Sequence, residues 1–112
     1  MSNVLFKCAE SDFPVLKISL DYKVLNSNAA ALPILQHWNC ANGTIIPEEI
    51  MRLYPELKYC LDRRVEGYVH VSYNEYTIKF SVIPFPEAGY VGLYGYLIEK
   101  TDQFNRVLRM LN

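Results

Sequence analysis

The stretch that decides the fold reads EYTIKFSVI at residues 75–83, PFPEAG at residues 84–89 and YVGLYGYLI at residues 90–98. In the first run large hydrophobic residues recur at every second position, namely Tyr76, Ile78, Phe80 and Val82. This two-residue period indicates a half-buried strand, and the aromatic and aliphatic content of the last run indicates another. Proline cannot donate a hydrogen bond to a sheet, so residues 84–89 are predicted to form the turn of a long antiparallel hairpin.

Length and composition indicate one domain. With 112 residues, 51% of them hydrophobic, the chain can bury a core of its own. A net charge of −1 gives no electrostatic footprint for nucleic acid, and no apolar run approaches the roughly 20 residues of a membrane span. The three cysteines are odd in number and far apart, which favours reduced thiols over disulfides or a metal site. We therefore expect a cytoplasmic protein with no nucleic-acid partner, no metal and no membrane segment.

Hydrophobic periodicity and capping residues predict the other elements. These are strands at residues 15–20, 24–27 and 67–72, a short helix from residue 29, and a helical segment at residues 47–61. Asn28 is placed to cap the short helix, and Pro55 is predicted to interrupt the helical segment near Tyr54. Hydrophobic residues at helical spacing are expected to face the core, namely Leu32, Leu35, Trp38, Ile50, Leu53, Tyr54, Leu57 and Leu61.

Both ends of the chain carry hydrophobic residues outside this core. Residues 1–12 are predicted to form a short arm or cap that covers another surface, and residues 13–100 the core of the domain. From Thr101-Asp102 onward hydrophobic residues recur at helical spacing, namely Phe104, Val107, Leu108 and Leu111. Residues 101–112 are therefore predicted to begin an amphipathic helix.

The order of elements and several local strings resemble the PAS sensory domain family over nearly the whole chain. PVLKISLD at residues 14–21 is similar to the first PAS strand and its turn, and LNSNAA at residues 25–30 to the second strand and its asparagine-capped helix. IPFPEAGYV at residues 83–91 is similar to the last hairpin of bacterial PAS domains. The resemblance implies an α+β fold with a curved five-stranded antiparallel sheet whose mouth is closed by short helices.

The resemblance also implies a ligand pocket on the inward face of the sheet. By strand parity this face should carry Ile78, Phe80, Val82, Val91, Leu93, Gly95 and Leu97, and the outward face Tyr90, Tyr94 and Tyr96. The predicted ligand-binding residues are Trp38, Ile50, Leu53, Leu57, Ile78, Phe80, Leu93, Gly95 and Leu97. Such an apolar wall suits a small hydrophobic or aromatic ligand. The alternative is a collapsed core that these same side chains fill.

PAS domains relay signals through an Asp-x-Thr motif at the end of the last strand. The corresponding residues here are Glu99-Lys100-Thr101, with glutamate in place of aspartate, so Glu99 and Thr101 are the predicted relay residues. We expect no cofactor. Asn39-Cys40 lacks the rest of the flavin-binding motif. His37 could serve as an axial haem ligand, but a single histidine beside Trp38 is more often solvated or hydrogen-bonded.

No nucleophile elbow or metalloprotease motif is present, so we expect no enzymatic activity. The leading hypothesis is a sensory and dimerisation domain of a larger signalling protein, such as a sensor kinase or a cyclic-dinucleotide enzyme. We expect a homodimer through the outward sheet face and the terminal helices, with a linked output domain beyond residue 112. The alternatives are an interaction module without a ligand and, third, a small half-barrel isomerase or hydratase.

Overall fold

The computed structural model describes residues 13–100, with side chains for residues 13–96. Its elements are β1 (Val15–Ser19), β2 (Val24–Ser27), η1 (Ala29–Ala31), α2 (Leu32–His37), α3 (Glu48–Leu53), α4 (Pro55–Arg63), β3 (Gly67–Tyr73), β4 (Tyr76–Phe85), η2 (Pro86–Ala88) and β5 (Tyr90–Lys100). Here η denotes a short 3-10 helix. The predicted N-terminal arm (residues 1–12) and the predicted helix from Asp102 lie outside the described residues.

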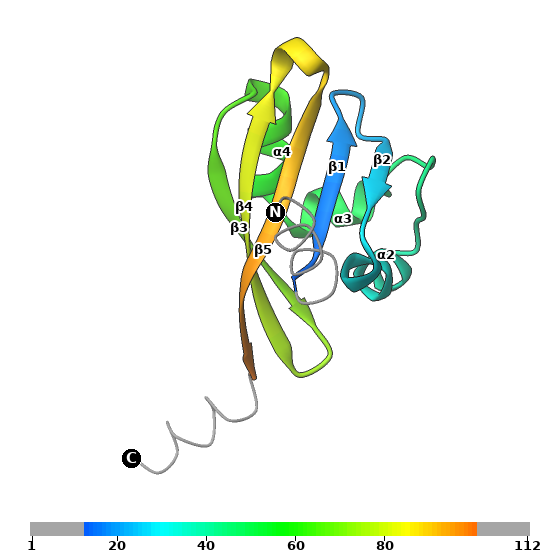
Figure 1. Ribbon diagram of the computed structural model, residues 1–112, viewed down its shortest axis with the longest axis vertical. Helices are drawn as coiled ribbons and strands as arrows, with labels where there is room; N and C mark the ends of the chain where they lie inside the picture. Colours follow the sequence, from blue (N-terminus) through cyan, green and yellow to red (C-terminus); the bar gives the residue numbers. More distant parts are fainter. Residues whose placement is uncertain (1–12, 101–112) are drawn as a thin grey trace, which may run out of the picture.

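The strands form one five-stranded antiparallel sheet in the order β2-β1-β5-β4-β3 (Figure 1). The last strand of the chain, β5, lies in the middle and pairs with both β1 and β4. The hairpin β4–β5 is therefore the centre of the fold, as its hydrophobic pattern predicts. An α+β fold with a five-stranded antiparallel sheet and short helices is confirmed.

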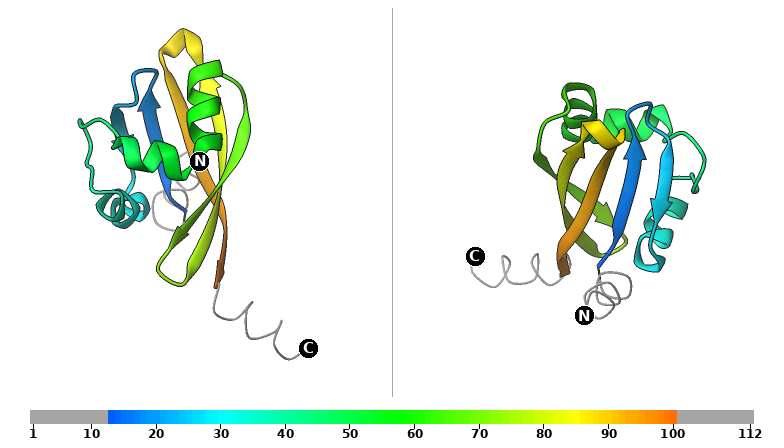
Figure 2. Two further views of the ribbon diagram at one scale, coloured as in Figure 1. Left: turned by 180° about the vertical axis from the view of Figure 1, so that it is seen from behind. Right: turned by 45° about the horizontal axis from the view of Figure 1, so that its top comes forward.

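The helices lie on one face of this sheet, with α4 over β3 and β4 (Figure 2). Alternate strand residues meet the helices in a single core, because successive side chains of a strand point to opposite faces. The largest side chains that are fully buried there are Trp38, Phe80, Leu16, Ile18, Ile34, Leu35, Leu57, Leu61 and Leu93. Burying each contributes roughly 1.5–3 kcal/mol relative to exposure, so this face of the sheet carries most of the stability.

The turn of the central hairpin is shorter than the sequence predicts. β4 continues through Pro84 and Phe85, which pair with Val91 and Tyr90, and only η2 and Gly89 reverse the chain. Proline is tolerated in this strand because the β3–β4 ladder ends at the pair Gly67–Val82. No neighbouring strand therefore requires a hydrogen bond from Pro84.

A β-bulge interrupts β5 near its end. Lys79 pairs with Leu97 whereas Phe80 pairs with Gly95, so Tyr96 is an additional residue in β5. Beyond the bulge Ile98, and not Leu97, is the partner of the inward residue Ile78. The unbroken two-residue alternation on which the inward assignment rests is therefore interrupted in β5, because the bulge adds one residue.

Asn28 caps the first helical segment, as predicted. Its side chain accepts a hydrogen bond from the Ala31 backbone N–H at 3.1 Å. The first turn is a 3-10 turn, and the α-helix begins only at Leu32, which brings Pro33 into its first turn where no N–H is required. Leu32 is 45% exposed, so the predicted inward stripe holds for Leu35 and Trp38 but not for Leu32.

The helical segment breaks at Tyr54, also as predicted. Tyr54 has φ −121° and ψ 74°, α3 ends at Leu53, and α4 begins at Pro55. Because of this break, α3 and α4 are rotated differently relative to the core. The hydrophobic residues predicted at helical spacing therefore do not form one continuous buried face through both helices. Met51 is buried in α3, whereas Leu53 is 63% exposed and lies outside the core, in contrast to its predicted position.

A polar contact ties the β1–β2 turn to α4. Tyr22 donates its hydroxyl hydrogen bond to the Asp62 carboxylate, which also binds Lys58 at 2.8 Å. The Lys58 and Tyr22 hydrogen bonds hold the pKa of Asp62 below its ordinary value, and the bond to Asp62 raises the pKa of Tyr22. Charged Asp62 thus stabilises the folded state.

The stabilisation from Asp62 depends on pH. A carboxyl whose pKa is lowered on folding stabilises the protein above its unfolded pKa, and this contribution disappears as the pH falls through the folded pKa. Asp62→Asn should lower the urea midpoint at pH 7, and the difference from wild type should vanish well below the ordinary pKa of 3.8. The effect should be small, because the pair is exposed to solvent. A difference that persists undiminished at pH 2 would contradict this assignment.

None of the helices between residues 13 and 100 has the length and apolar character needed to cross a membrane.

Candidate functional site

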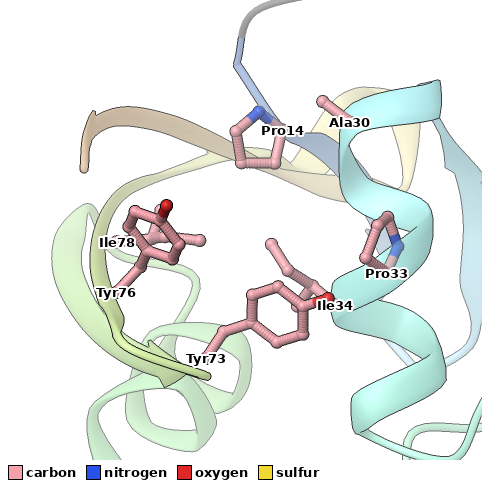
Figure 3. A pocket seen from close by; sticks show the side chains of 7 residues that line it. All are labelled: Pro14, Ala30, Pro33, Ile34, Tyr73, Tyr76 and Ile78. Atoms are coloured by element: carbon pink, nitrogen blue, oxygen red, sulfur yellow. The ribbon is translucent and has the colours of Figure 1, made fainter. Parts of the chain in front are cut away.

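An open pocket of about 340 Å³ lies at one end of the core (Figure 3). Three separate parts of the chain form it: the residue before β1, the helical segment η1–α2, and the hairpin β3–β4. Its lining residues are Pro14, Ala30, Pro33, Ile34, Tyr73, Tyr76 and Ile78. The pocket thus bridges the first helices and the tip of the hairpin.

Hydrogen bonds around Asn28 fix the first two parts relative to each other. Asn28 accepts a bond from the Val15 N–H at 3.0 Å and donates one to the Phe13 carbonyl at 2.7 Å. Pro14, between these partners, also accepts a backbone bond from Gly95 at 2.8 Å. The proline ring and the start of the helical segment are therefore held against the centre of the sheet.

Two tyrosines on the hairpin form the opposite side of the pocket. Tyr73 and Tyr76 pair across the turn Asn74-Glu75, where Asn74 adopts a left-handed conformation with φ 54°. Asparagine tolerates this conformation better than most residues, which suits a tight hairpin. The ring of His37, at the end of α2, meets the Tyr73 ring edge-on with centroids 5.5 Å apart. This contact spans from α2 to the hairpin.

The chemistry of the pocket is apolar with two polar points. Proline, alanine and isoleucine side chains have no hydrogen-bonding groups, so the hydroxyls of Tyr73 and Tyr76 are the only polar side-chain atoms among the lining residues. Figure 3 shows both rings beside the aliphatic side chains of Ile34 and Ile78. Such a site suits a small hydrophobic molecule with one hydroxyl or carbonyl group.

Of the nine predicted ligand-binding residues, Ile78 lines this pocket. Gly95 lies just behind it. A Cβ atom at Gly95 would approach the Pro14 ring to 2.7 Å and Ile78 to 3.1 Å. A larger residue at position 95 would therefore push both lining side chains into the pocket.

The other predicted residues do not line this pocket. Trp38, Leu57, Phe80 and Leu93 are between 0% and 1% exposed and pack with one another and their neighbours in the core. Ile50 is half-buried against that core, Leu53 lies on the surface, and the Leu97 side chain falls outside the described residues. The burial of Trp38, Leu57, Phe80 and Leu93 favours the collapsed-core alternative at these four positions.

Sequence reasoning did not identify six of the seven lining residues: Pro14, Ala30, Pro33, Ile34, Tyr73 and Tyr76. The sequence does contain one signal for two of these residues. Tyr73 and Tyr76 flank a two-residue hairpin turn, and the pairing of such residues brings both rings to the same face of the sheet. Nothing in the sequence indicates that this hairpin faces α2, because that contact depends on the path of the whole chain.

Of the two predicted relay residues, Glu99 lies beside the same hairpin. In the backbone ladder Glu99 pairs with Thr77, and Lys100 pairs with Tyr76, a lining residue of the pocket. Thr101 lies beyond the described residues. The hairpin tip and the end of β5 are therefore one continuous piece of sheet.

The outward face of the sheet carries the predicted tyrosines together with Tyr68. Tyr68 is 56% and Tyr96 47% exposed, whereas Tyr90 and Tyr94 are half-buried. Lysine side chains lie over several of these rings. The Lys79 ammonium is 4.6 Å from the Tyr68 ring centroid, and the Lys17 ammonium is 5.0 Å from that of Tyr90. The face is therefore aromatic and cationic.

The described cysteines are not arranged for chemistry. Burial raises the pKa of both Cys40 and Cys60, so both thiols stay protonated at neutral pH. Across residues 13–100, no three histidine, cysteine or acidic residues lie close enough together to hold a metal ion.

Comparison with known proteins adds no relatives: no protein-family model, curated protein sequence or solved structure matches the chain.

Proposed function

We propose that the chain is the sensory domain of a larger signalling protein, similar in design to PAS domains, that binds a small apolar molecule between α2 and the β3–β4 hairpin. The observation that carries this proposal is the apolar pocket of about 340 Å³ with two tyrosine hydroxyls on its hairpin side. Its volume lies at the lower end of the range for ligand sites, which suits a molecule of one or two rings. The order of two strands, short helices and three strands also agrees with the PAS resemblance.

The proposed signal passes from the hairpin to the end of β5. A ligand that contacts Tyr73, Tyr76 and Ile78 differently in its bound and free states favours one position of the hairpin tip. Because Tyr76 and Thr77 pair with Lys100 and Glu99, movement of the tip also moves the end of β5. In this proposal Glu99 and Thr101 then carry the change to the following segment.

Native mass spectrometry of freshly purified protein tests the existence of a ligand. The proposal expects a reproducible additional mass that disappears on mild unfolding and is released as a small organic molecule. Protein that carries no additional mass and binds no member of an apolar aromatic library would contradict the proposal.

A large side chain placed in the pocket should weaken ligand binding. Ala30 is half-buried and lines the pocket, whereas its neighbour Ala29 is exposed. With 2-naphthol as the probe in isothermal titration calorimetry, Ala30→Phe should weaken binding by at least ~10-fold, because the new ring occupies the space of the ligand. Ala29→Phe is the matched control and should bind as wild type. Equal weakening by both substitutions would place the probe elsewhere.

The second candidate is an interaction module that acts without a ligand. The aromatic and cationic outward face favours it, because tyrosines and half-buried lysines on one surface suit contact with another protein. Lys17 and Lys79 would require that the partner surface be acidic or aromatic. An empty domain that retains a specific protein partner through Tyr68 and Tyr96 would support this candidate over the first.

A further inference from the structure

The two edges of the sheet differ. The β2 edge is covered at its start, where residues 43–46 run alongside it. Val24 donates its N–H to the Thr44 carbonyl at 2.9 Å, Gly43 donates to the Val24 carbonyl at 2.7 Å, and Lys23 and Ile45 form a β-bridge. β2 is also short and pairs with β1 through a register shift, two features that protect an edge from further pairing.

The opposite edge, β3, lacks this protection. Among residues 13–100, β4 is the only segment that pairs with β3. The seven residues of β3 pair with β4 without a register shift. The strand GYVHVSY contains no proline, lysine or acidic residue, which are the usual means of blocking an edge.

The registers show which backbone groups of β3 point away from the sheet. Gly95 donates its N–H to the Pro14 carbonyl, so it bonds toward β1, and Tyr94 next to it bonds toward β4. The same alternation continues through the β4–β5 and β3–β4 registers. It directs the N–H and C=O groups of Tyr68, His70 and Ser72 away from β4, toward the free edge of the sheet. These groups form a template for one additional strand.

Exposed apolar side chains flank this edge on both faces of the sheet. Tyr68 is 56% exposed on the outward face. On the helix face, α4 lies over β3 and carries Tyr59, which is 58% exposed. Val65, which leads into β3, is 38% exposed. Another strand beside β3 would therefore find apolar neighbours above and below.

We propose that β3 is a homodimer interface, in which β3 of a second copy pairs antiparallel with it across a two-fold axis and the two sheets become one. This inference goes beyond the proposed ligand-binding function and does not depend on it. Antiparallel pairing places the Val69 and Val71 row, which is buried, beside the same row of the second copy. The outward face is less suited to contact between two copies, because Lys17 and Lys79 on each would meet.

Sedimentation equilibrium of the full chain tests this proposal, with variants at His70. His70→Pro removes an N–H that points to the free edge of the sheet and leaves the hydrogen bonds to β4 intact. His70→Glu places an acidic group opposite Lys79 within the chain, which supports folding. The proposed two-fold axis passes between the two copies of residue 70, so the same substitution brings like charges together in the dimer. His70→Thr, the matched control, keeps the N–H and the strand preference.

The wild-type chain and His70→Thr should form dimers, whereas His70→Pro and His70→Glu should dimerise about tenfold or more weakly. The proline variant loses a hydrogen bond that occurs twice in a two-fold interface, and the glutamate variant brings two carboxylates together. Amide exchange of Tyr68, His70 and Ser72 should slow as wild-type protein is concentrated, a measurement that does not depend on any variant. A wild-type monomer at high concentration would overturn the proposal and leave the edge for a strand of another protein. A dimer that resists both substitutions, or is lost in Tyr94→Ser, would overturn it in favour of the outward face.

Discussion

Phe80→Ala should lower the free energy of unfolding by about 3–5 kcal/mol, because Phe80 is fully buried and its truncation leaves a cavity in a close-packed core. Phe80 lies opposite Gly95 in the middle of the central hairpin. Few side chains could move to fill the space, since both neighbouring strands are held by ladder hydrogen bonds. Urea unfolding monitored by circular dichroism gives the difference.

Phe85→Ala is the matched control on the same strand. Phe85 is 37% exposed and packs against Tyr90 at the end of the hairpin, with ring centroids 5.1 Å apart. Its removal should lower the stability by roughly 1 kcal/mol, the value of a partly exposed aromatic pair. A loss below 1 kcal/mol for Phe80→Ala would show that Phe80 faces a space able to adapt, as in a ligand cavity, and would contradict the filled interior described above.

Asn28→Ala should lower the free energy of unfolding by about 2–4 kcal/mol. Its side chain is hydrogen-bonded to Phe13, Val15 and Ala31, which joins the entry of β1 to the helical segment, and each of these bonds contributes about 0.5–1.5 kcal/mol. The substitution also leaves the Ala31 N–H without its cap. Because these bonds position Pro14, the pocket should lose affinity for 2-naphthol as well. Thermal unfolding and calorimetry measure the two effects.

Asn28→Asp separates the stability that comes from the accepted hydrogen bonds from the stability that comes from the donated one. Aspartate keeps the oxygen that accepts from Val15 and Ala31 but cannot donate to the Phe13 carbonyl. The variant should therefore lose less stability than Asn28→Ala. If both variants were as stable as wild type, the asparagine would not hold the two segments together, and the pocket would require another explanation.

Much of the fold follows from local sequence patterns. The alternation at Ile78, Phe80 and Val82 predicts the central strand and its buried face, and each of these side chains is buried. Asn28 and Pro55 correctly predict a helix cap and a helix break, because both act on the backbone within one turn.

The errors occur where one residue changes the alternation or the helical phase. Tyr96 forms a bulge directly after Gly95, a residue type that often marks one, and it shifts the pairing register of every later position in β5. Leu53 fits a helical stripe in the sequence, yet the break at Tyr54 ends the helix there and leaves Leu53 on the surface. Such local irregularities are decided by tertiary packing rather than by residue preference.

The site is harder to predict than the fold for a related reason. A hydrophobic pattern identifies the residues that leave water, but it does not separate those that fill the interior from those that border an opening. Trp38 and Phe80 fill the interior, whereas Ile34 and Ile78, of the same character, also line the pocket. The difference lies in whether a neighbouring segment packs closely against the side chain. This depends on the volumes of all the side chains that meet at that place.

The loop beside β2 limits how far this sheet can grow. Ordered aggregates of β-proteins propagate because each added chain exposes a fresh edge for the next. Here residues 43–46 cover the start of β2, so growth of the sheet beyond a pair joined at β3 is hindered on that side. Shortening that loop, rather than altering the hydrophobic core, would be the change most apt to turn a closed pair into an open-ended polymer.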